Sequence, residues 1–167
     1  MIPAYDDFEW TTPARLTLLA RNEFPWRHYL RTVVQFSGPN CSGTVLPVAP
    51  GTGEETPPFG PLHVIAVVQP EAEPDNGENI ARMAVLDREL RDVGLQALPA
   101  VGASLDGRHR EDSRAVFGLD DGQARALGRR FGQVAVFAWR GTDWSLLACA
   151  ADRQTHRGWL WDPAPDC

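Results

Sequence analysis

Three residues with basic, acidic and hydroxyl side chains alternate in one short stretch of the chain. They are His109, Glu111 and Ser113, and alternate residues of a β-strand lie on one face of the strand. A catalytic triad also needs an activated nucleophile and an oxyanion hole. The sequence marks neither of these, and it has no Gly-x-Ser-x-Gly elbow. Hydrolase chemistry is therefore disfavoured, and Glu111 and His109 are kept as candidate acid–base groups.

The protonation state of Glu111 depends on the partner that the fold provides. An arginine such as Arg130 beside it would favour the ionised carboxylate, which would then orient the guanidinium. Burial without a partner would instead raise its pKa towards the range that suits proton transfer. A solvated carboxylate in a loop is the third alternative, and the sequence leaves all three open.

Further polar residues lie where predicted helices and strands begin or end, which is where ligands bind in open α/β sheets. We predict that Arg82 and Arg130 bind an anion and that Asn79 and Gln133 hydrogen-bond to the ligand. Structural roles are the alternatives: helix capping, an i,i+4 ion pair, dipole compensation or hydrogen bonds to a loop. The complete set of predicted ligand-binding residues is Glu78, Asn79, Arg82, Ser113, Arg130 and Gln133.

All 16 basic residues of the chain are arginine. The absence of lysine excludes the attachment of pyridoxal phosphate and a Walker A phosphate loop. We therefore predict no cofactor. A formal net charge of −6 argues against a nucleic-acid partner, because such binding depends on clustered positive charge.

The cysteines are Cys41, Cys149 and Cys167, which are odd in number and far apart. This pattern argues against a disulfide framework or a zinc knuckle, and we expect Cys167 to be mobile. The four histidines show no metal-ligand spacing, so no metal site is expected. The acidic start does not resemble a signal peptide, and no apolar run reaches the about 18 residues of a membrane span. We expect a cytoplasmic protein without a membrane partner.

Local patterns divide the chain into three parts. Residues 1–60 should contain a helix that is opened by Thr12 and Pro13 and ends near Pro25, a strand at 30–36 and a long Pro/Gly-rich loop. Residues 61–150 should form a core. Within this core, the patterns predict strands at 64–68, 96–101, 115–119, 133–139 and 144–150, a helix with a capping box at Asp75 and Glu78 that ends at Gly94, and a helix with a capping box at Asp120 and Gln123. Residues 151–167 should be a tail whose tryptophans pack back on the body.

This order of elements predicts a single domain with an α/β fold, and α+β is the alternative. The expected architecture is a mixed, mostly central sheet of about five to six strands with about two to three helices packed on it.

Several short motifs follow one another in a characteristic order between residues 63 and 139. They are Gln69-Pro70, Glu78-Asn79, Leu86, Leu90, Gly94, Gly102, Glu111, Ser113 and the run from Arg130 to Gln133. In this order the segment resembles the bacterial domain of unknown function 3293 family. The chain has Gln69 where that family usually has asparagine and His109 where it usually has tryptophan. The resemblance implies no activity.

Two functions fit these observations. The first is a domain that binds, or binds and transforms, a small anionic or polar metabolite in a pocket shared by Asn79, Glu111 and Gln133. The second is a non-enzymatic protein-interaction or accessory module that uses the Pro/Gly-rich loop and a tryptophan-rich surface. The surface tryptophans would be Trp139, Trp144, Trp159 and Trp161. A toxin-related accessory protein is a weaker third alternative.

Overall fold

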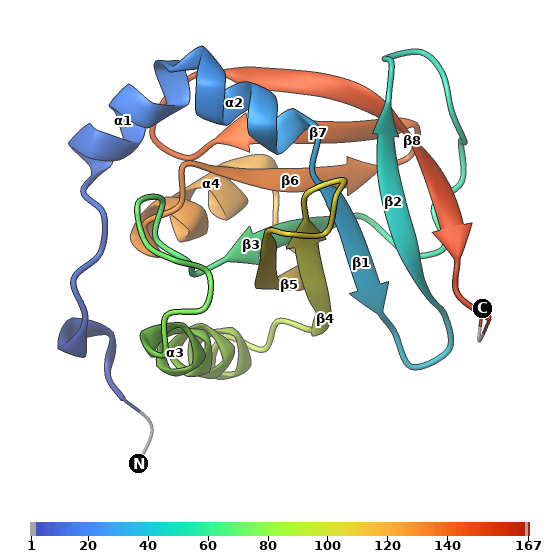
Figure 1. The fold of residues 1–167 in the computed structure, drawn as a ribbon. Coiled ribbons are helices and arrows are strands. Elements are labelled where there is room, and N and C mark those ends of the chain that lie inside the picture. Colours follow the sequence, from blue (N-terminus) through green and yellow to red (C-terminus); the bar gives the residue numbers. More distant parts are fainter. Residues whose placement is uncertain (1–2, 166) are drawn as a thin grey trace.

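The computed structural model describes residues 3–165 and Cys167 (Figure 1). Its helices are the short 3-10 helix η1 (Tyr5–Asp7), α1 (Pro13–Arg21), α2 (Glu23–Leu30), α3 (Glu78–Asp92) and α4 (Asp121–Arg130). Its strands are β1 (Val33–Ser37), β2 (Ser42–Val48), β3 (Leu62–Ala66), β4 (Ala97–Ala103), β5 (Arg110–Phe117), β6 (Ala135–Arg140), β7 (Asp143–Ala148) and β8 (Gln154–Pro163).

The eight strands form a closed barrel in the order β1-β2-β8-β7-β6-β3-β5-β4. Every pairing in the barrel is antiparallel, and the ladder between β1 and β4 closes it. The predicted mixed α/β sheet of five to six strands is therefore wrong. The prediction failed because β8 lies in the segment that we read as a tail, and because local patterns do not reveal which strands pair.

The strand β8 was missed because its inward face is polar over half its length. Thr155, Arg157, Trp159 and Trp161 alternate on that face, opposite inward residues of β7 and β2. Only the last two are hydrophobic, so the period of two that marks a strand is visible over too few residues. The tryptophans do pack on the body, as predicted, but as part of the barrel wall.

An aromatic cluster fills the barrel interior. The ring of Trp139 lies at its centre, with centroid distances of 5.2 Å to Phe36, 5.8 Å to Trp144 and 5.0 Å to Trp159. Trp139, Trp144 and Trp159 are each at most 2% exposed, and Trp161 is partly buried against the same cluster. The tryptophan-rich surface that motivated the interaction-module hypothesis is therefore absent from the described residues.

Two helices cover the barrel from outside, and the other two pack at its open end. α3 and α4 pack against the outward residues of β3, β5 and β6, whereas α1 and α2 lie on the side opposite α3 (Figure 1). The helix starts at Thr12 and Asp120 are confirmed, because these side chains accept hydrogen bonds from Arg15 N and Gln123 N. The capping box at Asp75 is wrong: α3 begins after Gly77, and the Asn76 side chain accepts from Glu78 N.

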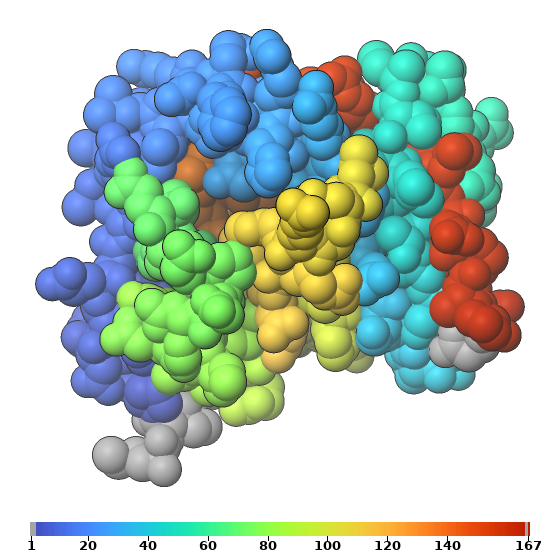
Figure 2. Space-filling view, in the orientation of Figure 1, coloured from blue at the N-terminus to red at the C-terminus, as the bar shows by residue number. Residues whose placement is uncertain are grey.

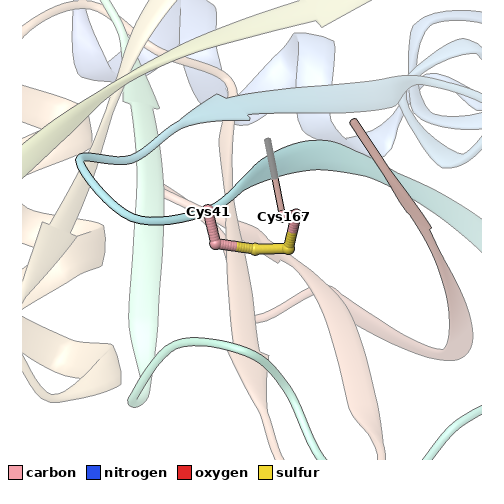
Figure 3. The surroundings of a disulfide bond; sticks show 2 residues. All are labelled: Cys41 and Cys167. Atoms are coloured by element: carbon pink, nitrogen blue, oxygen red, sulfur yellow. A yellow bond between two sulfur atoms is a disulfide. The ribbon is translucent and has the colours of Figure 1, made fainter. Parts of the chain in front are cut away.

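A disulfide joins Cys41, in the turn between β1 and β2, to Cys167 (Figure 3). The β2–β8 ladder brings the two cysteines together, because it pairs Gly43 with Pro163. Our expectation of an unpaired, mobile Cys167 is wrong for this reason: sequence separation hid a contact made by strand pairing. Cys149 is free and buried, and burial raises the pKa of its thiol to about 12. None of the described helices combines the length and the apolar character that crossing a membrane requires.

Candidate functional site

A cavity of about 270 Å³ opens into the barrel next to α2. Figure 2 shows its entrance as a hollow between α2 (blue), the segment that follows β3 (green) and the β4–β5 hairpin (yellow). Its apolar wall includes Val64 and Ala66 of β3, Phe137 of β6 and Leu146 of β7. The cavity is thus the open end of the barrel interior, beyond the aromatic cluster.

Four of the predicted site residues line this cavity: His109, Glu111, Ser113 and Gln133. Glu111 and Ser113 share the inward face of β5 with Ala115, which belongs to the barrel core. Their neighbour Arg114 points the other way, where its guanidinium binds Asp87 of α3. Strand alternation therefore places the acid and the hydroxyl together, as their spacing predicts.

The Glu111 carboxylate has an unusual environment for an acidic side chain. Among the described residues, no donor forms a hydrogen bond to it. His109 Nε2 lies 3.6 Å from Glu111 Oε1, which is beyond hydrogen-bonding distance and is an ion pair only when the imidazole is protonated. Burial raises the pKa of Glu111, and His109 partly opposes this effect. Of the three alternatives for Glu111, burial without an arginine partner agrees best with this geometry, although the burial is partial, since the side chain is 27% exposed.

Gln133 presents a fixed hydrogen-bond acceptor to the cavity. Its side chain amide nitrogen donates to the carbonyls of Val68 and Phe131, each at 3.1 Å, and the residue is only 7% exposed. These two bonds fix the orientation of the amide and leave Oε1 without a donor in the part of the chain that the structure describes. The amide oxygen is therefore available to a ligand.

The backbone before Gln133 is held by a second glutamine. Gln69 Nε2 donates to Val67 O and Phe131 O, and Gln69 Oε1 accepts from the backbone and hydroxyl of Thr11. Gly132 has a φ of 70°, and a Cβ there would collide with the Gln69 amide. The Phe131-Gly132-Gln133 segment is thus packed closely against the Gln69 amide, and this packing places the Gln133 side chain in the lining of the cavity.

The remaining predicted residues do not reach this cavity. The Arg82 guanidinium lies over the rings of Phe8 and Trp10, donates to Glu9 O and sits 3.4 Å from Glu78 Oε2. The predicted anion clamp is therefore not formed here, since these contacts hold Arg82 against the N-terminal segment.

The same segment engages Arg130, whose guanidinium pairs with Glu89 and stacks 3.8 Å from the Tyr5 ring centroid. Asn79 donates to the carbonyls of Glu73 and Pro74 and so holds the loop before α3. For Glu78, Arg82, Asn79 and Arg130 the structural alternatives account for the contacts seen.

The sequence pattern missed the helix that covers the cavity. Phe24, His28 and Tyr29 of α2 line it, although the predicted N-terminal helix ends near Pro25. Pro25 falls in the first turn of α2, where a missing amide hydrogen costs nothing, so it does not end a helix. Burial raises the pKa of Tyr29, to which the Glu111 charge contributes, so the phenol stays protonated and is a hydrogen-bond donor at neutral pH.

Comparisons with known proteins agree with the resemblance noted in the sequence. Residues 70–136 match the model of a family described as protein of unknown function (DUF3293). No curated protein and no solved structure matches the chain. The matched segment contains His109, Glu111, Ser113 and Gln133, whereas α2 lies outside it. Residues 70–136 of this chain are therefore similar to the DUF3293 family.

Proposed function

We propose that the protein binds a small polar organic molecule in the cavity at the open end of its barrel, and that Glu111 exchanges a proton with that molecule. The observation that carries this proposal is the convergence of Glu111 and Ser113 of β5 with Gln133, which lies just before β6, on one cavity. Barrel mouths are frequent ligand sites, and about 300 Å³ is the lower end of the usual range of pocket volumes.

The chemistry of the lining supports a ligand with both polar and apolar parts. Glu111 and Gln133 offer acceptors, Tyr29 offers a donor, and Val64 and Phe137 supply apolar wall. A carboxyl group with a raised pKa in such a cavity suits general acid–base chemistry, which is the role that we assign to Glu111. An anionic ligand is no longer supported, because Arg82 and Arg130 do not line the cavity.

The substitution Ala66→Phe tests this function without removing a polar group. Ala66 lines the cavity from β3, so the larger ring should fill it. In a thermal-shift screen of polar metabolites and nucleotides, a ligand at 100 times its Kd should stabilise the wild type by about 2.7 kcal/mol. Ala66→Phe should abolish that shift.

The matched control is Ala14→Phe, because Ala14 is exposed on α1 and outside the cavity. It should retain the shift. A ligand that stabilises Ala66→Phe as strongly as the wild type would show that it binds somewhere else and would refute the proposal.

We also expect Glu111→Gln to raise the melting temperature at neutral pH. Burial raises the folded-state pKa of Glu111 above its unfolded value, so the protein is favoured while the carboxyl is protonated. That contribution is complete below the ordinary glutamate pKa and is lost as the pH rises through the folded-state value. The difference between variant and wild type should therefore be small in acid and should grow towards neutral pH in thermal melts.

The groups that face Glu111 across the cavity are His109, His28 and Tyr29, and both proteins carry all of them. Asp112→Asn is the control, since Asp112 is the next residue of β5 and points outward. The difference in melting temperature between Asp112→Asn and the wild type should not grow with pH. If Glu111→Gln melts below the wild type at neutral pH, the carboxylate is stabilising and this account of the site is wrong.

A further inference from the structure

We infer that the molecule bound in this cavity carries a positive charge, as a protonated amine or amidine does, and that this group is held by Glu111 and Gln133. This inference rests on the proposed function and names its ligand class. The first observation is the charge of the lining: Glu111 is its single carboxylate, and no arginine contributes to it among the described residues.

The arginines nearest to Glu111 in sequence are directed elsewhere. Arg110 donates to Gln35 at 3.0 Å, and Arg114 forms a bidentate pair with Asp87. Arg108 is 90% exposed and lies near Asp106. Among the described residues, the arginines therefore supply no permanent cation to the Glu111 carboxylate. Its side chain is 27% exposed, so the ionised form is only partly solvated and a cationic partner would stabilise it.

His109 is the one group of the chain that competes for this role. Its imidazole is 45% exposed, and its Nε2 lies 3.6 Å from Glu111 Oε1. A protonated His109 would act as a counter-ion, whereas a neutral His109 leaves the carboxylate to the ligand. His28 lies close by, with its ring centroid 6.0 Å from that of His109, and it adds a second base but no fixed charge.

Two further acceptors complete a site for a hydrogen-bond donor. Gln133 Oε1 is fixed by the two bonds that its amide nitrogen makes, as described above. The Ser113 hydroxyl donates weakly to Glu111 O at 3.3 Å, so its oxygen can accept a further bond. An ammonium group has three donors and no acceptor, which matches this set better than a carboxylate or phosphate does.

The walls around these acceptors suit an apolar body attached to the cation. Tyr29 supplies an aromatic ring to the lining, and cations bind favourably over such rings. A cavity of about 150 Å³ already holds benzene, so the volume of about 270 Å³ seen here can take one ring with a short amine-bearing arm.

Three probes of the same size and different charge test the inference: benzylammonium, benzyl alcohol and benzoate. Isothermal titration at millimolar probe should give wild-type protein a Kd for benzylammonium at least about tenfold lower than for benzoate, which corresponds to about 1.4 kcal/mol. Glu111→Gln should bring the three affinities to within a factor of about two. Circular dichroism melts show that the variant is folded.

The controls distinguish a failure of the charge assignment from a failure of the proposed function of the cavity. Equal binding of the three probes, abolished by Ala66→Phe, overturns the charge assignment and leaves the cavity as a ligand site. A preference for benzylammonium that persists in Glu111→Gln also overturns it, because the net charge of −6 would then be the cause. Binding of no probe, or binding that Ala66→Phe does not affect, overturns the proposed function as well.

Discussion

Replacing Trp139 with alanine is expected to lower the free energy of unfolding by about 3–5 kcal/mol, which is a large part of a typical domain's stability. Trp139 is 1% exposed and lies in the middle of the barrel interior, in contact with aromatic rings from β1, β7 and β8. The indole ring fills the middle of the barrel interior. Its removal leaves a cavity, because the paired strands around it cannot move inward to fill the space.

One feature of Trp139 reduces this loss. Its indole Nε1 is buried without a hydrogen-bond partner in the described structure, so the substitution also removes an unsatisfied donor. We therefore expect a value towards the lower end of the range, measured by urea denaturation with the slope compared between variants. The control is Phe24→Ala, an aromatic residue that is 83% exposed and should change stability by no more than about 0.5 kcal/mol. A loss below about 1 kcal/mol for Trp139→Ala would show that the aromatic cluster is not the stabilising core.

Loss of the Cys41–Cys167 disulfide has the second largest expected effect. The bond spans 126 residues and ties the end of β8 to the β1–β2 turn. Cross-links over loops of this length typically stabilise by about 2–4 kcal/mol, because they restrict the unfolded chain. The double substitution Cys41→Ser and Cys167→Ser should lower the melting temperature accordingly, and reductant should lower that of the wild type by the same amount.

Two measurements make this prediction decisive. Reductant should leave the doubly substituted protein unchanged, which controls for its effects on the rest of the molecule. Thiol titration of the unfolded, unreduced protein should detect Cys149 alone. Detection of all three thiols, or a wild-type melt that reductant does not change, would contradict the prediction.

The disulfide also bears on where the protein works. Disulfides that persist are typical of oxidising compartments and rare in the reducing cytosol. The cytoplasmic location that we expect from the sequence therefore stays a prediction. Thiol titration of protein isolated from its native source measures this directly, since a reduced Cys41 would agree with the cytosol.

Local sequence patterns predicted several elements well. The apolar repeat that ends at Gly94 predicted α3, and the spacing of Asp120 and Gln123 predicted the start of α4. Strand alternation placed Glu111 and Ser113 on one face, and both line the cavity. Each of these features depends on residues close together in sequence, so a periodicity or a capping motif is sufficient to predict it.

The sequence by itself determined the helices α3 and α4 and most of the strands. It also excluded chemistry that requires a lysine of this chain, and it placed Glu111 and Ser113 on one face of a strand. Only the tertiary structure decided that eight strands close into a barrel, that Cys41 meets Cys167, and that α2 brings Tyr29 over the cavity. It also decided that Arg82 and Arg130 contact aromatic rings of the N-terminal segment. The physical reason is the same in each case: strand pairing and side-chain contacts across more than a hundred residues leave no local pattern, because they depend on how the whole chain packs.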